Sequence, residues 1–264
     1  MSTKARNSVR VFGDGKETMI FSHGYGCDQN MWRLLTPDFA ARYRIIVFDL
    51  VGSGRSDLKA YDREKYKTLG GHARDVLEIL GELSQGPAVF VGHSVSGMIG
   101  ALAAIEQPEQ FSSLVMIGPS PCYVNHPGYT GGFTREDIDS LLDTLDSNYL
   151  GWASSMAPVI MGAKDQPELA VELTNSFCAT DPEIAKHFAR VTFLSDNRED
   201  LPKLKTRSLI LQSSDDVIAP LPVGQYLHER LAGSTLKVID NIGHCPHLSA
   251  PRQIAEAMAG FLQG

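Results

Sequence analysis

The chain has 264 residues, of which 43% are hydrophobic and 21% charged, a composition typical of a globular protein and not of a disordered or fibrous one. A formal net charge of −7 without a basic stripe argues against nucleic acid as a partner. No apolar run approaches the roughly eighteen residues of a membrane span, and the first ten residues lack the apolar core of a signal peptide. We therefore expect a cytoplasmic protein with no nucleic-acid or membrane partner.

Short apolar, β-branched runs alternate with helical patterns along the chain. Six runs predict strands, at residues 18–22, 44–50, 89–92, 113–118, 208–212 and 236–240. Between them the hydrophobic period becomes helical, as at Val76, Leu77 and Leu80. This alternation predicts an α/β protein with a mostly parallel central sheet and helices on both faces.

The alternation stops between about residues 122 and 203. Four amphipathic helical segments occur there instead, beginning near residues 134, 148, 167 and 181. Thr134, with Asp137 three residues later, opens the first of them like a capping box. A helical insertion in a βα series is most simply a lid over the ligand-binding edge of the sheet; an independent helical bundle is the alternative. We expect a core of residues 1–121 and 204–264 with a lid at 122–203, within a single domain.

The run Val-Phe-Val-Gly-His-Ser-Val-Ser-Gly at 89–97 places Ser94 on a turn between a predicted strand and an Ala-rich helix. Such a turn needs small neighbours, and it lifts the serine hydroxyl above the positive end of the helix. The usual pattern is Gly-x-Ser-x-Gly, whereas here Ser96 stands at the closing position and Gly97 follows. Ser94 is the predicted nucleophile.

A nucleophilic serine needs a base, and the base needs an acid that orients it. His244 follows the last predicted strand and is the preferred base, with His247 as its nearest rival. Asp215 and Asp216 both follow the fifth predicted strand, and their position leaves the choice of acid open. The order serine, acid, histidine is that of the α/β-hydrolases.

The oxyanion of such a reaction is stabilised by backbone N–H groups after the nucleophile and after an early central strand. The loop His-Gly-Tyr-Gly at 23–26 follows the first predicted strand. The N–H groups of Tyr25 and Val95 are therefore the predicted donors. His23 is expected to fix the loop, and His93 to be structural.

Other chemistries fit the chain poorly. A dinucleotide fingerprint at Gly52 and Gly54 needs a third glycine where Asp57 stands, and no phosphate-binding P-loop is present. Residues 49–56 are better explained as a structural turn beside the 23–26 loop. The four cysteines form no Cys-x-x-Cys pair, which favours free thiols, and His-Cys-Pro-His at 244–247 lacks further metal ligands. We expect neither a cofactor nor a metal.

Taken in order, these motifs resemble those of the α/β-hydrolases over nearly the whole chain. A narrower resemblance is to the RsbQ-like family and the related plant strigolactone and karrikin receptors, and it rests on residues 24–32, 49–54, 92–96, 118–123, 148–152 and 243–247. The resemblance implies a triad of Ser94, Asp216 and His244, and its register selects Asp216 over Asp215. It also implies a V-shaped lid of four helices above an apolar pocket.

Six residues fall at or near the pocket positions of that family: Tyr25, Tyr123, Trp152, Met156, Phe177 and Phe193. Tyr25 stands where a phenylalanine is common, so it is expected to add a hydroxyl to the pocket. Met156 replaces a bulky aromatic residue.

These observations predict a serine hydrolase for a small, largely apolar ester or lactone, such as a butenolide. The alternative is a ligand receptor with slow or single-turnover hydrolysis. For an RsbQ-like protein, the implied partner is a PAS-domain serine phosphatase of a general stress response. A lyase on the same fold stays open, because a fold does not determine a reaction.

Overall fold

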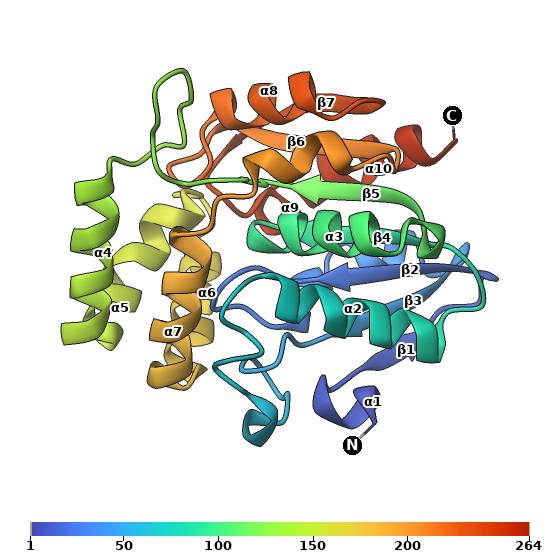
Figure 1. The fold of residues 1–264 in the computed structure, drawn as a ribbon, viewed down its shortest axis with the longest axis horizontal. Coiled ribbons are helices and arrows are strands. Elements are labelled where there is room, and N and C mark those ends of the chain that lie inside the picture. Colours follow the sequence, from blue (N-terminus) through green and yellow to red (C-terminus); the bar gives the residue numbers. More distant parts are fainter. Residues whose placement is uncertain (1, 264) are drawn as a thin grey trace.

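The computed structural model describes residues 2–263, and a seven-stranded sheet forms its centre (Figure 1). The strands lie in the order β1-β3-β2-β4-β5-β6-β7, with β1 antiparallel to β3 and every other neighbouring pair parallel. Their bounds are β1 (Arg10–Phe12), β2 (Glu17–Ser22), β3 (Tyr43–Phe48), β4 (Ala88–His93), β5 (Phe111–Ile117), β6 (Ser208–Asp215) and β7 (Ser234–Ile242). The six predicted strands are confirmed. The short edge strand β1 was not predicted, because three half-exposed residues carry no clear hydrophobic pattern.

Helices cover both faces of the sheet, which confirms the predicted α/β class (Figure 1). The α-helices are α1 (Thr3–Arg6), α2 (Gly70–Leu83), α3 (Val95–Glu106), α4 (Arg135–Ser147), α5 (Tyr149–Met161), α6 (Pro167–Ala179), α7 (Pro182–Phe193), α8 (Leu221–Arg230), α9 (Pro246–Ser249) and α10 (Pro251–Gln263). Short 3₁₀ turns are η1 (Gln29–Trp32), η2 (Thr36–Asp38), η3 (Leu58–Ala60), η4 (Pro108–Gln110) and η5 (Arg198–Lys203). Within residues 2–263, no helix has the length and apolar character that crossing a membrane requires.

The strands are buried on both faces because successive side chains point to opposite sides. In β4, Phe90 packs in the cluster that includes α2 and α3, whereas Val89 and Val91 pack in the cluster that includes Trp32 and α10. Two apolar cores therefore sandwich the sheet and hold the ends of its central strands in place.

Helices α4 to α7 lie between β5 and β6 in the chain and stand beyond the carboxyl ends of the strands (Figure 1). We call these four the lid helices. The predicted capping box is present: the Thr134 side chain accepts from the Asp137 backbone N–H, and the Asp137 carboxylate accepts from the Thr134 N–H. Asp181 caps α7, whose first residue is Pro182. These caps fix the positions at which α4 and α7 begin.

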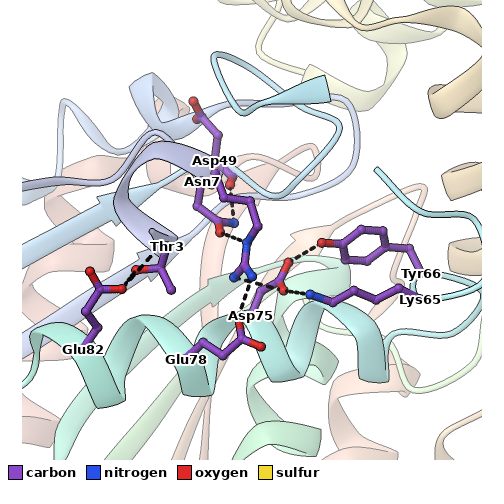
Figure 2. A network of polar contacts seen from close by, with 9 residues as sticks. Thr3, Asn7, Asp49, Lys65, Tyr66, Asp75, Glu78 and Glu82 are labelled. Carbon is purple, nitrogen blue, oxygen red and sulfur yellow. Dashed lines mark hydrogen bonds and ion pairs between the residues drawn. The ribbon is translucent and has the colours of Figure 1, made fainter. Parts of the chain in front are cut away.

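A buried ion network joins the N-terminal segment to α2 (Figure 2). Asp75 is fully buried, and its carboxylate lies 3.1 Å from the Arg6 guanidinium and 2.5 Å from the Lys65 ammonium. The Tyr66 hydroxyl donates to the same carboxylate at 2.8 Å. Glu78, on the next turn of α2, is a more exposed partner of Arg6.

We expect Asp75→Ala to lower the free energy of unfolding by about 3 kcal/mol, because removing one member of a buried ion cluster leaves the other charges without compensation. The value lies at the lower end of the range because Arg6 and Lys65 are 14% and 27% exposed and keep contact with water. Glu78→Ala is the matched control, with less than about 1 kcal/mol expected for an exposed pair. Urea unfolding measures both; equal effects would contradict a special role of the buried carboxylate.

Candidate active site

Ser94 occupies a sharp turn between β4 and α3. Its φ of 56° and ψ of −125° place a non-glycine residue in the left-handed half of conformational space, a strain that is found at functional positions. The Ser94 N–H donates to the Ile117 carbonyl at 2.8 Å, which ties the turn to β5. A Cβ at Gly92 would lie 2.5 Å from the Ser96 carbonyl oxygen, so only glycine fits there.

Three predicted residues form an unbroken chain of hydrogen bonds. The Ser94 Oγ lies 2.8 Å from His244 Nε2, and His244 Nδ1 lies 2.7 Å from Asp216 Oδ2. The other carboxylate oxygen of Asp216 accepts from the N–H groups of Ile218 and Ala219 at 2.8 and 3.1 Å. These bonds hold the carboxylate in one orientation behind the imidazole.

The two rival residues lie elsewhere. Asp215 ends β6 with an exposed side chain, and its carbonyl accepts from Gly243 at 2.7 Å. His247 is fully buried against Trp32, with 4.8 Å between ring centroids, and burial lowers the pKa of His247 to about 3. His247 is therefore a packing residue.

His93 supports the backbone of His244. Its Nε2 donates to the His244 carbonyl at 2.8 Å, and its ring lies 4.3 Å from that of His247. Burial, and then the neighbouring histidines, hold the pKa of His93 well below its usual value, so it stays neutral. This agrees with the structural role that was expected of it.

The 23–26 loop is fastened to the core at two points. Ser96 Oγ donates to the His23 carbonyl at 2.5 Å and accepts from Ser22 Oγ at 2.8 Å. His23 Nδ1 donates to the Gly24 carbonyl at 2.8 Å, and the Leu50 N–H donates to His23 Nε2 at 3.0 Å. The serine that breaks the usual elbow pattern thus helps to hold this loop, and residues 49–56 lie beside it as expected.

The two predicted oxyanion donors have no competing acceptor. Among residues 2–263, neither the Tyr25 N–H nor the Val95 N–H donates a hydrogen bond to another group of the chain. Val95 is the first residue of α3, where N–H groups have no acceptor within the helix and the helix dipole favours negative charge.

The same loop is also bound to the lid helices. The Tyr25 hydroxyl donates to the Ala185 carbonyl of α7 at 3.1 Å, and Ser176 Oγ of α6 donates to the Gly26 carbonyl at 2.8 Å. Tyr25 was expected to add a hydroxyl to the pocket; it lines the cavity, and its hydroxyl already has a backbone partner in α7. Gly26 has a φ of 68°, and a Cβ there would lie 2.3 Å from the Phe177 ring.

A cavity of about 30 Å³ lies between the loop, Ser94 and the lid helices. Five of the six predicted pocket residues line it: Tyr25, Tyr123, Trp152, Phe177 and Phe193. The sequence reasoning missed further lining residues, namely Cys27, Ile160, Leu173, Thr192, Ile218 and Cys245. They lie in three helices (α5, α6 and α7) and three loops, and no motif marks them.

Met156 is the sixth residue predicted at or near the pocket, and it does not line this cavity. It lines a surface groove between α4 and α5 with Leu141 and Thr144. Trp152, one turn earlier in α5, lines both this groove and the Ser94 cavity.

Cys122, His126 and Asp196 bring their donor atoms within 4.8 Å of one another, at the base of the lid helices. Both oxygens of Asp196 accept from Arg198, at 2.8 and 2.6 Å, and burial raises the pKa of the Cys122 thiol. A protonated thiol beside a guanidinium is a poor cation site, and we assign no metal to it. All four cysteines are free thiols.

The fold and the site together define a class of hydrolases. Residues 19–257 match the alpha/beta hydrolase family, and the chain belongs to it. Its structure is similar to that of a hydrolase from Oleispira antarctica, with a TM-score of 0.96 and 43% identity over 99% of this chain and 96% of that one.

Two plant proteins are similar over nearly their whole length. The karrikin insensitive 2 receptor CA of Petunia hybrida is 39% identical over 93% of this chain and 91% of its own. The strigolactone esterase D14 of Arabidopsis thaliana is 36% identical over 94% of this chain and 93% of its own. The predicted resemblance to the plant receptors is confirmed.

Proposed function

We propose that the protein is a serine hydrolase that cleaves a small carboxylic ester or lactone, with a butenolide as the model substrate. The observation that carries this proposal is the hydrogen-bonded series Ser94, His244, Asp216 beside an apolar cavity. Esterase-named relatives support the same reaction class.

In the proposed reaction, Ser94 Oγ attacks the substrate carbonyl carbon while His244 Nε2 takes the hydroxyl proton. Asp216 keeps Nδ1 protonated and stabilises the imidazolium. The N–H groups of Tyr25 and Val95 bind the oxyanion of the tetrahedral intermediate. The intermediate collapses when the C–O bond to the alcohol breaks and His244 returns the proton to it. Water, deprotonated by His244, then attacks the acyl carbonyl and frees Ser94.

We propose further that residues 122–203 act as a lid on a core of residues 1–121 and 204–264. A cavity of about 30 Å³ holds about one water molecule, so any ester must displace side chains of the lid helices to reach Ser94. Tyr25, Tyr123, Trp152, Phe177 and Phe193 then form the walls of the substrate site.

Covalent labelling tests this proposal. A fluorophosphonate is expected to label the protein with one equivalent, and mass spectrometry of the peptides to place the label on Ser94. Ser94→Ala is expected to abolish labelling, whereas Ser154→Ala, on an exposed part of α5, is expected to leave it intact. Absence of a label, or a label on another residue, would refute Ser94 as the nucleophile.

A second candidate function is that of a ligand receptor, supported by the receptor-named relatives. In this case the protein acts as an RsbQ-like regulator in a stress response, and a ligand-dependent state binds a PAS-domain serine phosphatase. Single-turnover kinetics separate the two functions. A burst of one product per protein followed by slow release favours the receptor; rapid multiple turnover without a ligand-dependent partner favours the enzyme.

A further inference from the structure

Two hydroxyl groups at the Ser94 cavity lack a hydrogen-bond partner. Tyr123 and Thr192 both line the cavity, and each side chain belongs to a residue that is only 1% exposed. Among residues 2–263, neither the Tyr123 hydroxyl nor Thr192 Oγ1 makes a hydrogen bond of normal length and angle, although the Ser94 hydroxyl is close enough to Tyr123 to lower the pKa of its phenol. Tyr25, the other tyrosine of the cavity, has its hydroxyl bound to α7.

The state of Thr192 is unusual for a threonine in a helix. Such a hydroxyl commonly donates to the carbonyl four residues earlier. Thr174 Oγ1 does so with Ala170 at 2.8 Å, and Thr144 Oγ1 with Ser140 at 2.8 Å. Thr192, in the last turn of α7, makes no such bond and lines the cavity instead.

Tyr123 lines the cavity from a different part of the chain, the segment that follows β5. Burial raises the pKa of Tyr123 to about 12, although the nearby Ser94 hydroxyl opposes the shift. The phenol is therefore protonated at neutral pH and is available as a donor. One donor thus comes from the segment after β5 and one from α7, and both line the same cavity.

A buried hydroxyl without a partner costs free energy that a hydrogen bond recovers, so sites that contain one select ligands that supply the missing acceptor. We propose that the natural substrate carries a second oxygen acceptor, apart from the reacting carbonyl, which receives hydrogen bonds from Tyr123 and Thr192. The substrate class is then an oxygen-substituted ester or lactone, and not one with a purely hydrocarbon acyl part. This proposal rests on the proposed hydrolase function.

Matched p-nitrophenyl esters test it, because they share one leaving group and differ in one atom. Methoxyacetate is compared with butyrate, and 3-methoxypropanoate with pentanoate; in each pair an ether oxygen replaces a methylene. Each value of kcat/KM is divided by the rate of hydrolysis of the same ester by hydroxide, which removes intrinsic reactivity. We expect the native protein to prefer the ether member of at least one pair by about 10-fold or more.

Tyr123→Phe and Thr192→Val remove the hydroxyls with little change of shape. Each is expected to reduce severalfold the ratio of kcat/KM for the ether ester to kcat/KM for the matched hydrocarbon ester. Because each variant removes an unpartnered buried hydroxyl, its Tm is expected to stay the same or to rise by about 2–4 °C. Thr174→Val is the matched control; it removes a lid-helix hydroxyl that already has a partner and should leave the preference intact.

The outcomes distinguish a failure of this inference from a failure of the proposed hydrolase function. If Ser94→Ala hydrolysed these esters as well as the native protein does, the hydrolase proposal would fail. If Ser94→Ala were inactive, but neither pair showed a preference that Tyr123→Phe and Thr192→Val reduce, the hydrolase proposal would stand and this inference would be overturned.

Discussion

Ser94→Ala is expected to lower kcat/KM for p-nitrophenyl acetate by at least about 10⁴-fold, because the reaction then has no nucleophile for His244 to activate. The fold should survive, since the Ser94 contact with β5 is made by its backbone N–H. Alanine in place of serine also keeps the small side chain that the turn requires. Steady-state hydrolysis with active-site titration measures the effect.

Ser154→Ala is the control for this experiment, because its hydroxyl is exposed and bonds only to the Leu150 carbonyl. A second variant, Asp216→Ala, should also lower the rate by several orders of magnitude, since Asp216 orients His244. If the activity of Ser94→Ala were within 10-fold of the native value, another residue would have to be the nucleophile.

Acid is expected to unfold the protein over a narrow range below pH 6.5, because three histidines are buried in neutral form. Burial lowers the pKa of His72 and of His247 to about 3, and it holds the pKa of His93 well below the usual value of 6.5. Neither ring nitrogen of His72 or His247 has a partner among residues 2–263, so a proton would remain uncompensated.

Proton linkage gives the direction in which stability changes with pH. Below pH 6.5 the unfolded chain binds protons on these histidines and the folded chain does not, so stability is complete above that pH and is lost as the pH falls. Each histidine contributes about 1.4 kcal/mol per pH unit between its unfolded and folded pKa values, and three contribute about 4 kcal/mol per pH unit. A protein of ordinary stability would therefore unfold when the pH falls about two units below 6.5.

Urea unfolding at intervals from pH 7.5 to 4.5 measures this slope. His72→Phe and His247→Phe keep an aromatic ring in place and should each flatten the slope by about 1.4 kcal/mol per pH unit. His228→Gln, at an exposed position of α8, should not change it. If the free energy of unfolding changed with pH by the same amount in all three variants, groups other than His72 and His247 would cause the acid sensitivity.

Local patterns along the chain determined most of the architecture. Alternating apolar runs mark buried parallel strands, and the capping box at Thr134 and the Asp181 cap mark where lid helices begin. The strand-to-helix turn identified Ser94, because small residues on both sides of a serine are a local requirement of that geometry. The position of His244 after the last strand is local in the same sense.

Tertiary structure decided what depends on side-chain direction. Asp215 and Asp216 are adjacent in the chain, yet only Asp216 contacts His244, because β6 ends at Asp215 and the next residue turns inward. Met156 lines the groove between α4 and α5 and not the Ser94 cavity, and the Tyr25 hydroxyl bonds to Ala185, 160 residues away.

Thr192 carries no sequence signal at all. Its importance lies in a hydrogen bond that it does not make within α7, and in a cavity whose other walls come from distant segments. Periodicity and motifs report contacts within a few residues along the chain, whereas the partner of a buried polar group is set by packing between elements. For this reason the sequence alone predicted Ser94 as nucleophile and His244 as base, and only the folded chain shows the buried hydroxyls of Tyr123 and Thr192 that we propose to bind the substrate.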